Sequence, residues 1–112
     1  MSSSIIRHTN YTLLIVELSK LDSTVSQQLK AEIVGIEKNN AINLVIDITQ
    51  VRYCDSSGLG ALLLANRLFN TEKSKFILLG SQPTVKKLIQ ISQLDSILVC
   101  KDTLEELEPL FT

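Results

Sequence analysis

Four consecutive residues near the middle of the chain, Asp55-Ser56-Ser57-Gly58, have types and a spacing that could support chemistry. The apolar run 44–48 precedes them and is typical of a buried strand, and a helix rich in leucine and alanine is predicted after them. Both hydroxyls therefore stand where a strand passes into a helix N-terminus. Free backbone N–H groups and the helix dipole favour negative charge there. Such a turn can bind phosphate, or one of its serines can be phosphorylated.

The same residues also have a purely structural interpretation. Asp55, Ser56 and Ser57 are all residue types that cap helices, and an α/β sequence would use them for that purpose alone. Three capping candidates in a row exceed what capping needs. The residues by themselves leave both interpretations open.

Catalysis finds little support in the sequence. A nucleophile elbow needs Gly-x-Ser-x-Gly, and Cys54 occupies the upstream glycine position around Ser56. The one histidine, His8, lies in the N-terminal segment, so no base is predicted beside the serine. Gly58-Leu-Gly60 lacks the third glycine of a dinucleotide site, and no Walker motif is present. Serine hydrolysis is kept only as a weak alternative. We expect no enzyme activity, no cofactor and no metal ion.

Length and composition limit the remaining classes of function. The 112 residues suffice for one hydrophobic core, so we expect one domain over residues 1–112. The formal charge of −1 and the absence of tryptophan argue against a nucleic-acid surface. No apolar run could span a membrane or serve as a signal peptide, so we expect a cytoplasmic protein without membrane insertion. Cys54 and Cys100 are predicted to be reduced structural thiols, with a redox role for Cys54 as the minor alternative.

Predicted strands and helices alternate along most of the chain. The expected strands are a short N-terminal edge strand near residues 5–6 and the ranges 13–18, 44–48, 76–79 and 97–100. The expected helices begin at Asp22 or Ser23, at about Ser57, near Pro83, and after Asp102, where Glu105 would complete a capping box. This order predicts an α/β fold whose mainly parallel sheet is built from successive βα units.

Two loops should meet at one edge of that sheet. Ser19–Asp22 and Asp55–Gly58 each follow the carboxyl end of a predicted strand. Because the carboxyl ends of parallel strands lie on the same side, sites in α/β proteins collect there. We therefore expect both loops to contribute to one functional region.

Helix periodicity predicts a contact surface on the helix after the turn. At about 100° per residue, Ala61, Ala65, Leu68 and Phe69 share the core side. Leu59 and Leu63 fall on the opposite side, among the polar residues Asn66, Arg67 and Asn70. An apolar pair on a polar face suggests partner binding. The alternative is that another segment of the chain covers one of the leucines.

The run Val45–Leu62, Val-Ile-Asp-Ile-Thr-Gln-Val-Arg-Tyr-Cys-Asp-Ser-Ser-Gly-Leu-Gly-Ala-Leu, resembles the signature of STAS domains. STAS domains include bacterial anti-sigma factor antagonists and the cytoplasmic domains of sulphate transporters. The resemblance extends to Leu21-Asp22, to residues 94–98 and to residues 103–107, and so covers nearly the whole chain.

In the bacterial regulators of this family, the serine after the aspartate is phosphorylated by a partner that is both kinase and anti-sigma factor. The resemblance implies that Ser56 is the acceptor, with Asp55 orienting it and Ser57 and Gly58 completing the motif. The unphosphorylated protein would bind the anti-sigma factor and free the sigma factor, phosphorylation would end that binding, and a cognate phosphatase would reverse it.

The family also places the loop before the first helix in the partner surface. The resemblance therefore adds Ser19, Lys20 and Asp22 to the candidate contact residues. Ser19 and Lys20 stand where the family usually has a glycine and a polar residue, and Cys54 where a larger apolar residue is common. The alternative function within the family is a constitutive STAS subunit of a lipid-transport complex or signalling scaffold, in which the serine is structural.

Overall fold

The computed structural model describes residues 2–111, and its main sheet has five strands in the order β1-β2-β4-β6-β7. β1 pairs antiparallel with β2 at one edge, and the remaining neighbours pair in parallel. This confirms the predicted α/β fold with a mainly parallel sheet and an N-terminal edge strand. The five strands are β1 (Ser3–Arg7), β2 (Thr12–Val16), β4 (Leu44–Asp47), β6 (Phe76–Leu79) and β7 (Val99–Lys101).

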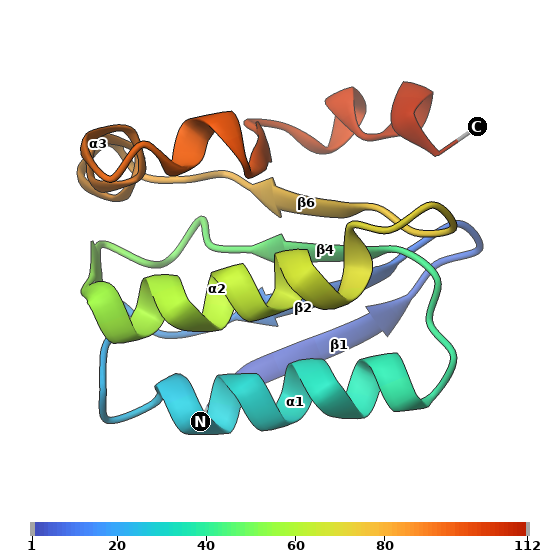
Figure 1. Ribbon diagram of the computed structural model, residues 1–112, viewed down its shortest axis with the longest axis horizontal. Helices are drawn as coiled ribbons and strands as arrows, with labels where there is room; N and C mark the ends of the chain where they lie inside the picture. Colours follow the sequence, from blue (N-terminus) through green and yellow to red (C-terminus); the bar gives the residue numbers. More distant parts are fainter. Residues whose placement is uncertain (1, 112) are drawn as a thin grey trace.

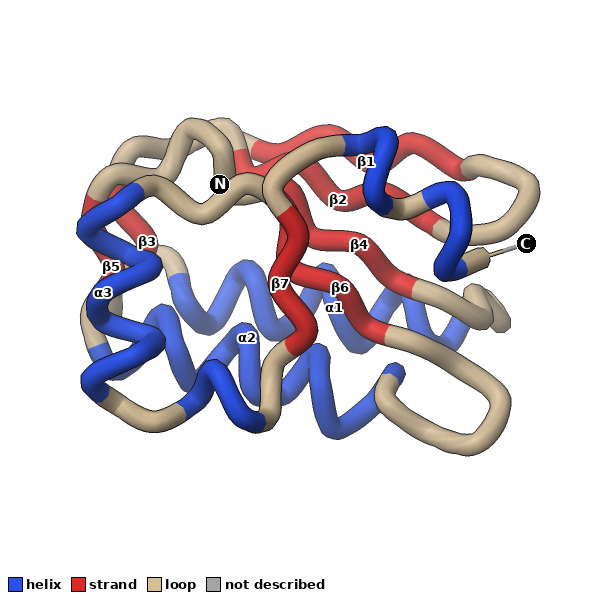
Figure 2. The backbone as a smooth tube through the Cα atoms, turned by 90° about the horizontal axis from the view of Figure 1, so that it is seen from above, coloured by secondary structure: helices blue, strands red, loops and turns tan. Residues whose placement is uncertain are grey.

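Helices α1 (Ser26–Lys38) and α2 (Ser56–Phe69) lie side by side against one face of this sheet (Figures 1 and 2). A second sheet consists of two short parallel strands, β3 (Lys20–Leu21) and β5 (Tyr53–Cys54). Helix α3 (Pro83–Ile91) lies beside β5. Three 3₁₀ helices follow, at Leu94–Ser96, Leu104–Glu106 and Glu108–Leu110.

The two faces of the sheet bury separate clusters, because successive side chains of a strand point to opposite sides. Alternate residues such as Leu14, Ile46 and Leu78 pack under α1 and α2. The residues between them form a smaller cluster that Leu107 covers, with help from Tyr11, Leu110 and Phe111. The C-terminal segment thus shields the sheet face that lacks long helices (Figure 2). The members of this smaller cluster on the sheet are Leu13, Val45, Ile77 and Leu79.

The largest departure from the predicted elements is at the C-terminus. Two 3₁₀ helices replace the single expected helix. The acidic residue that closes this segment is Glu106, whose carboxylate accepts from the Asp102 N–H and the Thr103 hydroxyl, both at 3.3 Å, so the expected role of Glu105 was wrong. Pro109 limits the segment because proline cannot donate the backbone hydrogen bond that would continue a helix.

The start of α1 also differs from the prediction. Its N-cap is Val25, which makes no side-chain cap, so neither Asp22 nor Ser23 is the capping residue. Asp22 instead accepts hydrogen bonds from the N–H and hydroxyl of Thr24 and closes a turn before the helix. The helix is fixed mainly by its buried residues, Leu29, Ile33 and Ile36, which repeat at the predicted helical spacing.

Replacement of Leu107 by alanine tests the role of the C-terminal cover. Leu107 is 1% exposed, and its loss should lower the free energy of unfolding by about 2–5 kcal/mol. Leu104→Ala is the matched control, because Leu104 is 54% exposed and its truncation should change stability by only about 0.5 kcal/mol. Urea titrations followed by circular dichroism measure both. Equal effects would mean that the segment does not cover the sheet.

Candidate functional site

The small β3–β5 sheet brings the two predicted loops together. Lys20 pairs with Tyr53 and Leu21 with Cys54. The carbonyl of Ser19 accepts from the N–H groups of Arg52 and Tyr53, at 2.8 and 3.1 Å. The expectation that Ser19–Asp22 and Asp55–Gly58 share one edge is therefore confirmed. Ser19 and Lys20 are exposed beside this turn, and Asp22 is half-buried.

Asp55 alone supplies the cap of α2. Its backbone is extended, and its Oδ1 accepts a hydrogen bond from the Gly58 N–H at 3.0 Å. The capping interpretation therefore accounts for Asp55 but not for the two serines. Within residues 2–111 neither the Ser56 nor the Ser57 hydroxyl makes a hydrogen bond. Ser56 is exposed and Ser57 is half-buried, so the two hydroxyls differ in accessibility.

Glycine is required at position 58 because there is no room for a side chain, and not because of its backbone conformation. A Cβ atom at this position would lie 2.2 Å from the Leu21 carbonyl oxygen and 2.7 Å from Cys54 Sγ. Its φ is not in the left-handed region, where glycine is favoured for conformational reasons. The same Leu21 carbonyl accepts from the Asp55 N–H at 3.3 Å. The backbone of β3 therefore approaches Gly58 closely, and the first turn of α2 packs directly against β3.

Cys54 fills the space beneath this turn. Its thiol is buried and lies 3.4 Å from the Asp55 carbonyl oxygen. Burial, with a smaller contribution from the Asp55 charge, raises its pKa to about 12. The thiol therefore stays protonated at neutral pH, which disfavours the redox alternative because the thiolate is the reactive form. Both cysteines are free, and Cys54 is buried as a structural thiol would be, whereas Cys100 is exposed.

Asp22 places a negatively charged carboxylate in the loop before α1. Hydrogen bonds from the Thr24 hydroxyl and then from the Thr24 N–H lower the pKa of Asp22, and Lys20 adds a smaller effect. The carboxylate therefore remains ionised well below neutral pH. The Asp22 carbonyl also accepts from the N–H groups of Val25 and Ser26, so this residue joins the loop to the start of α1.

The prediction that Leu59 and Leu63 both lie on the exposed side of α2 was wrong for Leu59. Leu59 is 7% exposed and belongs to the main core, because α1 packs along the side of α2 that a helical wheel assigns to solvent. Leu63 is half-buried and lines a shallow hollow of about 370 Å³ between α1 and α2, together with Lys30, Gly60, Leu64 and Arg67. Arg67 is exposed and Asn66 is half-buried. Leu63, Asn66 and Arg67 remain candidate contact residues.

An apolar depression that the sequence does not predict lies next to the turn. It lies between β5 and α3, where Tyr53 is 49% exposed and Ile91 is 68% exposed. Thr84, Lys87 and Leu88 complete its lining with the edge of Cys54. The two-residue strand β5 is too short for alternation to predict which way Tyr53 points, and the packing of α3 against it is not encoded locally.

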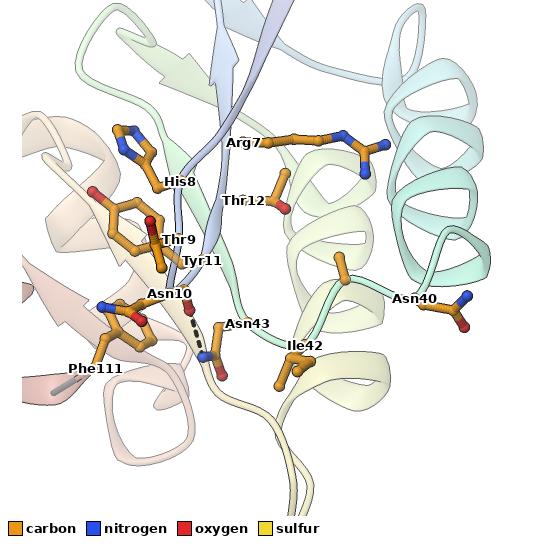
Figure 3. Close-up of a pocket in the computed structure, with 11 residues that line it drawn as sticks. Arg7, His8, Thr9, Asn10, Tyr11, Thr12, Asn40, Ile42, Asn43 and Phe111 are labelled. Carbon is orange, nitrogen blue, oxygen red and sulfur yellow. Dashed lines mark hydrogen bonds between the residues drawn. The ribbon is translucent and has the colours of Figure 1, made fainter.

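Another hollow, of about 340 Å³, lies at the opposite end of the sheet (Figure 3). It sits between the β1–β2 hairpin and residues 40–43, at the amino ends of the parallel strands. Tyr11 stacks there on His8 and Phe111, with ring centroids 4.6 and 5.0 Å apart. None of the predicted site residues lines it.

The described residues, 2–111, contain neither a candidate metal cluster nor a candidate membrane helix. No group of three or more His, Cys, Asp or Glu residues in this range could hold a metal ion. No helix in the described part of the chain combines the length and apolar character that a membrane span requires.

Comparison with known proteins identifies the family. The family model of the STAS domain matches residues 4–107. The chain belongs to the STAS domain family. The turn from Asp55 to Gly58 lies within the matched residues.

Relatives of this STAS protein are named as anti-sigma factor antagonists. It is 28% identical over 83 residues to an anti-sigma-B factor antagonist of Listeria monocytogenes, covering 74% of this chain and 73% of that protein. It is 29% identical over 92 residues to an anti-sigma F factor antagonist of Paenibacillus polymyxa, covering 80% and 79% of the two chains.

Solved structures share the fold. An anti-sigma factor antagonist from Mycobacterium paratuberculosis has a TM-score of 0.87 at 19% identity, over 98% of this chain and 92% of that one. SpoIIAA has a TM-score of 0.71 in its unphosphorylated form, over 97% of this chain and 94% of that one. The phosphorylated form of SpoIIAA from Bacillus gives 0.72, over 97% and 99%. Both SpoIIAA forms are 22% identical to this STAS protein.

Gly58→Ala tests the close contact between α2 and β3. The added methyl group would overlap the Leu21 carbonyl oxygen and should destabilise the protein by about 1–3 kcal/mol. Gly60→Ala is the matched control, because nothing lies within 4 Å of a Cβ there and alanine favours a helix by about 0.5–1 kcal/mol. Thermal and urea unfolding measure the two variants. A Gly58→Ala protein as stable as the Gly60→Ala protein would contradict the contact.

Proposed function

We propose that this STAS protein is an anti-sigma factor antagonist whose binding is switched off by phosphorylation of Ser56. The observation that carries the proposal is an exposed, unbonded Ser56 hydroxyl at the start of α2, on a turn that other groups hold in place. A purely structural serine would be expected to use its hydroxyl in the cap, and Asp55 already fills that role. The names of the Listeria and Paenibacillus relatives support the class of function.

Accessibility favours Ser56 over Ser57 as the phosphoacceptor. A kinase must bring the serine Oγ into line with the terminal phosphate of ATP. The hydroxyl must therefore be exposed at the protein surface. Ser56 is exposed and Ser57 is half-buried. This agrees with the acceptor position that the family motif implies.

The partner that fits this proposal is an anti-sigma factor with serine kinase activity, and a cognate phosphatase would restore the unmodified form. Its contact surface would combine the loop beside the turn with the exposed part of α2. Nothing in this function requires catalysis by the STAS protein, nucleic-acid binding or a cofactor. The proposed contact residues are Ser19, Lys20, Asp22, Leu63, Asn66 and Arg67.

Simple electrostatics indicates how the switch would act. Phosphoserine adds about −1.5 to −2 charges at neutral pH. The N-terminus of α2 favours that charge by about 0.3–1 kcal/mol, and the neighbouring Asp55 carboxylate opposes it on a similar scale. The two effects nearly cancel within the free protein. At an interface shaped for a neutral hydroxyl, however, an uncompensated charge costs several kcal/mol, and each 1.4 kcal/mol is about tenfold in affinity.

Ser56→Ala is the direct test of the acceptor. We expect the wild-type protein, incubated with ATP and a lysate of its host, to gain one phosphate that Ser56→Ala lacks and Ser57→Ala retains. Intact-mass measurement followed by peptide mapping reads out the result. Phosphate on Ser57 would overturn the assignment. No phosphate on the wild-type protein would favour the constitutive STAS subunit instead.

The mechanism of release is tested by backbone NMR of the free and phosphorylated proteins. Because the opposing charge effects nearly cancel, chemical-shift changes should be confined to residues around Ser56, and the melting temperature should move by only a few degrees. Shift changes throughout the sheet would indicate an allosteric switch.

A further inference from the structure

The outer edge of β1 is open, and the hydrogen-bond register decides which residues face it. The His8 N–H donates to the Tyr11 carbonyl at 2.9 Å, and the Glu17 N–H donates to the Ser2 carbonyl at 3.0 Å. In an antiparallel pair the hydrogen-bonded positions alternate along the strand, so the even-numbered residues of β1 bond to β2. The odd-numbered residues, Ser3, Ile5 and Arg7, therefore present their N–H and C=O groups at the open edge.

The side chains of these odd-numbered residues lie on the helix-covered face of the sheet. Ser3 and Ile5 pair with Val16 and Leu14, whose side chains belong to the core under α1 and α2. The Ser3 hydroxyl donates to Glu32 Oε1 on α1 at 2.5 Å. Arg7 extends toward α1 on the same face (Figure 3). Ile5 itself is 46% exposed at the edge.

Two oppositely charged side chains on this face have polar atoms without a hydrogen-bond partner. Glu32 Oε2 is buried and accepts no hydrogen bond. Arg7 makes neither a hydrogen bond nor an ion pair with any residue from 2 to 111. A buried carboxylate oxygen without a donor is costly, and such atoms are rare in folded proteins. Within one chain Arg7 and Glu32 do not meet, because Glu32 contacts the other end of β1 at Ser3.

We propose that β1 pairs antiparallel with β1 of a second copy of this chain, about a two-fold axis at Ile5. In this register Ile5 faces the partner's Ile5, and Ser3 faces the partner's Arg7. Because facing residues in an antiparallel pair project to the same face, the guanidinium of the partner's Arg7 comes beside the Glu32 carboxylate that Ser3 holds. Symmetry creates this ion pair twice, and the open backbone groups of both strands become bonded.

A second copy fits this edge better than an unrelated strand for two reasons. The edge is self-complementary, with an apolar residue at its centre, a cation at one end and an anion held at the other. Its five residues also contain neither proline nor lysine, which commonly protect open edges. The other edge strand, β7, has three residues and ends in Lys101.

A cysteine at the centre of the edge tests the register. Facing residues of a hydrogen-bonded pair have Cα atoms about 5.5 Å apart, which suits a disulfide. In a Cys100→Ser background, Ile5→Cys should oxidise rapidly to a covalent dimer. Val99→Cys in the same background is the control, because Val99 is exposed on the opposite edge and should cross-link at least tenfold more slowly. Equal rates would overturn the proposal.

Charge exchange tests the ion pair on the intact chain by sedimentation equilibrium. The wild-type protein should show a monomer–dimer equilibrium, and Arg7→Glu and Glu32→Arg should each weaken the dimer at least tenfold. The double variant, Arg7→Glu with Glu32→Arg, should recover most of the loss. A wild-type protein that stays monomeric up to about 1 mM, or a double variant no better than the singles, would overturn the proposal. Phosphorylation of Ser56 in these variants is a separate readout and should match the wild type.

Discussion

The contact between the first turn of α2 and the carbonyl of Leu21 is the constraint on which the functional region depends. A side chain at Gly58 would overlap that oxygen, so the helix can lie this close to β3 only because the residue has no Cβ. The Asp55 N–H bonds the same carbonyl, and the Asp55 carboxylate caps the Gly58 N–H. Three interactions thus meet at one point and fix the direction in which α2 leaves the sheet. Ser56 stands on this rigid support with its hydroxyl unused.

The surroundings of Ser56 suit a binding switch better than a catalytic centre. The neighbouring thiol of Cys54 is kept protonated by burial, and Asp55 is occupied as a helix cap. Within residues 2–111 the Ser56 hydroxyl has no hydrogen-bond partner, and His8 stacks on Tyr11 at the other end of the sheet. What remains at the turn is an exposed hydroxyl, a helix N-terminus and nearby charged side chains. In the proposed function, a partner would recognise this surface by its shape and charge, and a phosphate would alter both.

The sheet separates this region from the other features of the molecule. The turn lies at the carboxyl ends of the parallel strands, whereas the β1 edge runs along the side of the sheet. On the face away from α1 and α2, short 3₁₀ helices and Leu107 complete the core with few residues. Self-association through β1 would leave this C-terminal cover in place. The proposed partner switch and the proposed pairing of two copies therefore involve separate residues, and substitutions should affect them independently.

Features that depend on local patterns could be predicted from the sequence. Buried strands such as 76–79 are continuous apolar runs, and helices repeat their apolar residues every three or four positions. The Asp55–Gly58 motif predicts a strand-to-helix turn. The meeting of the two loops followed from the geometry of parallel strands. Only the tertiary structure decided which flank of α2 was covered, because the position of α1 moved Leu59 from a predicted surface into the core. The exposure of Tyr53 and the buried, unbonded Glu32 Oε2 likewise depend on contacts between segments distant in sequence, which no local periodicity encodes.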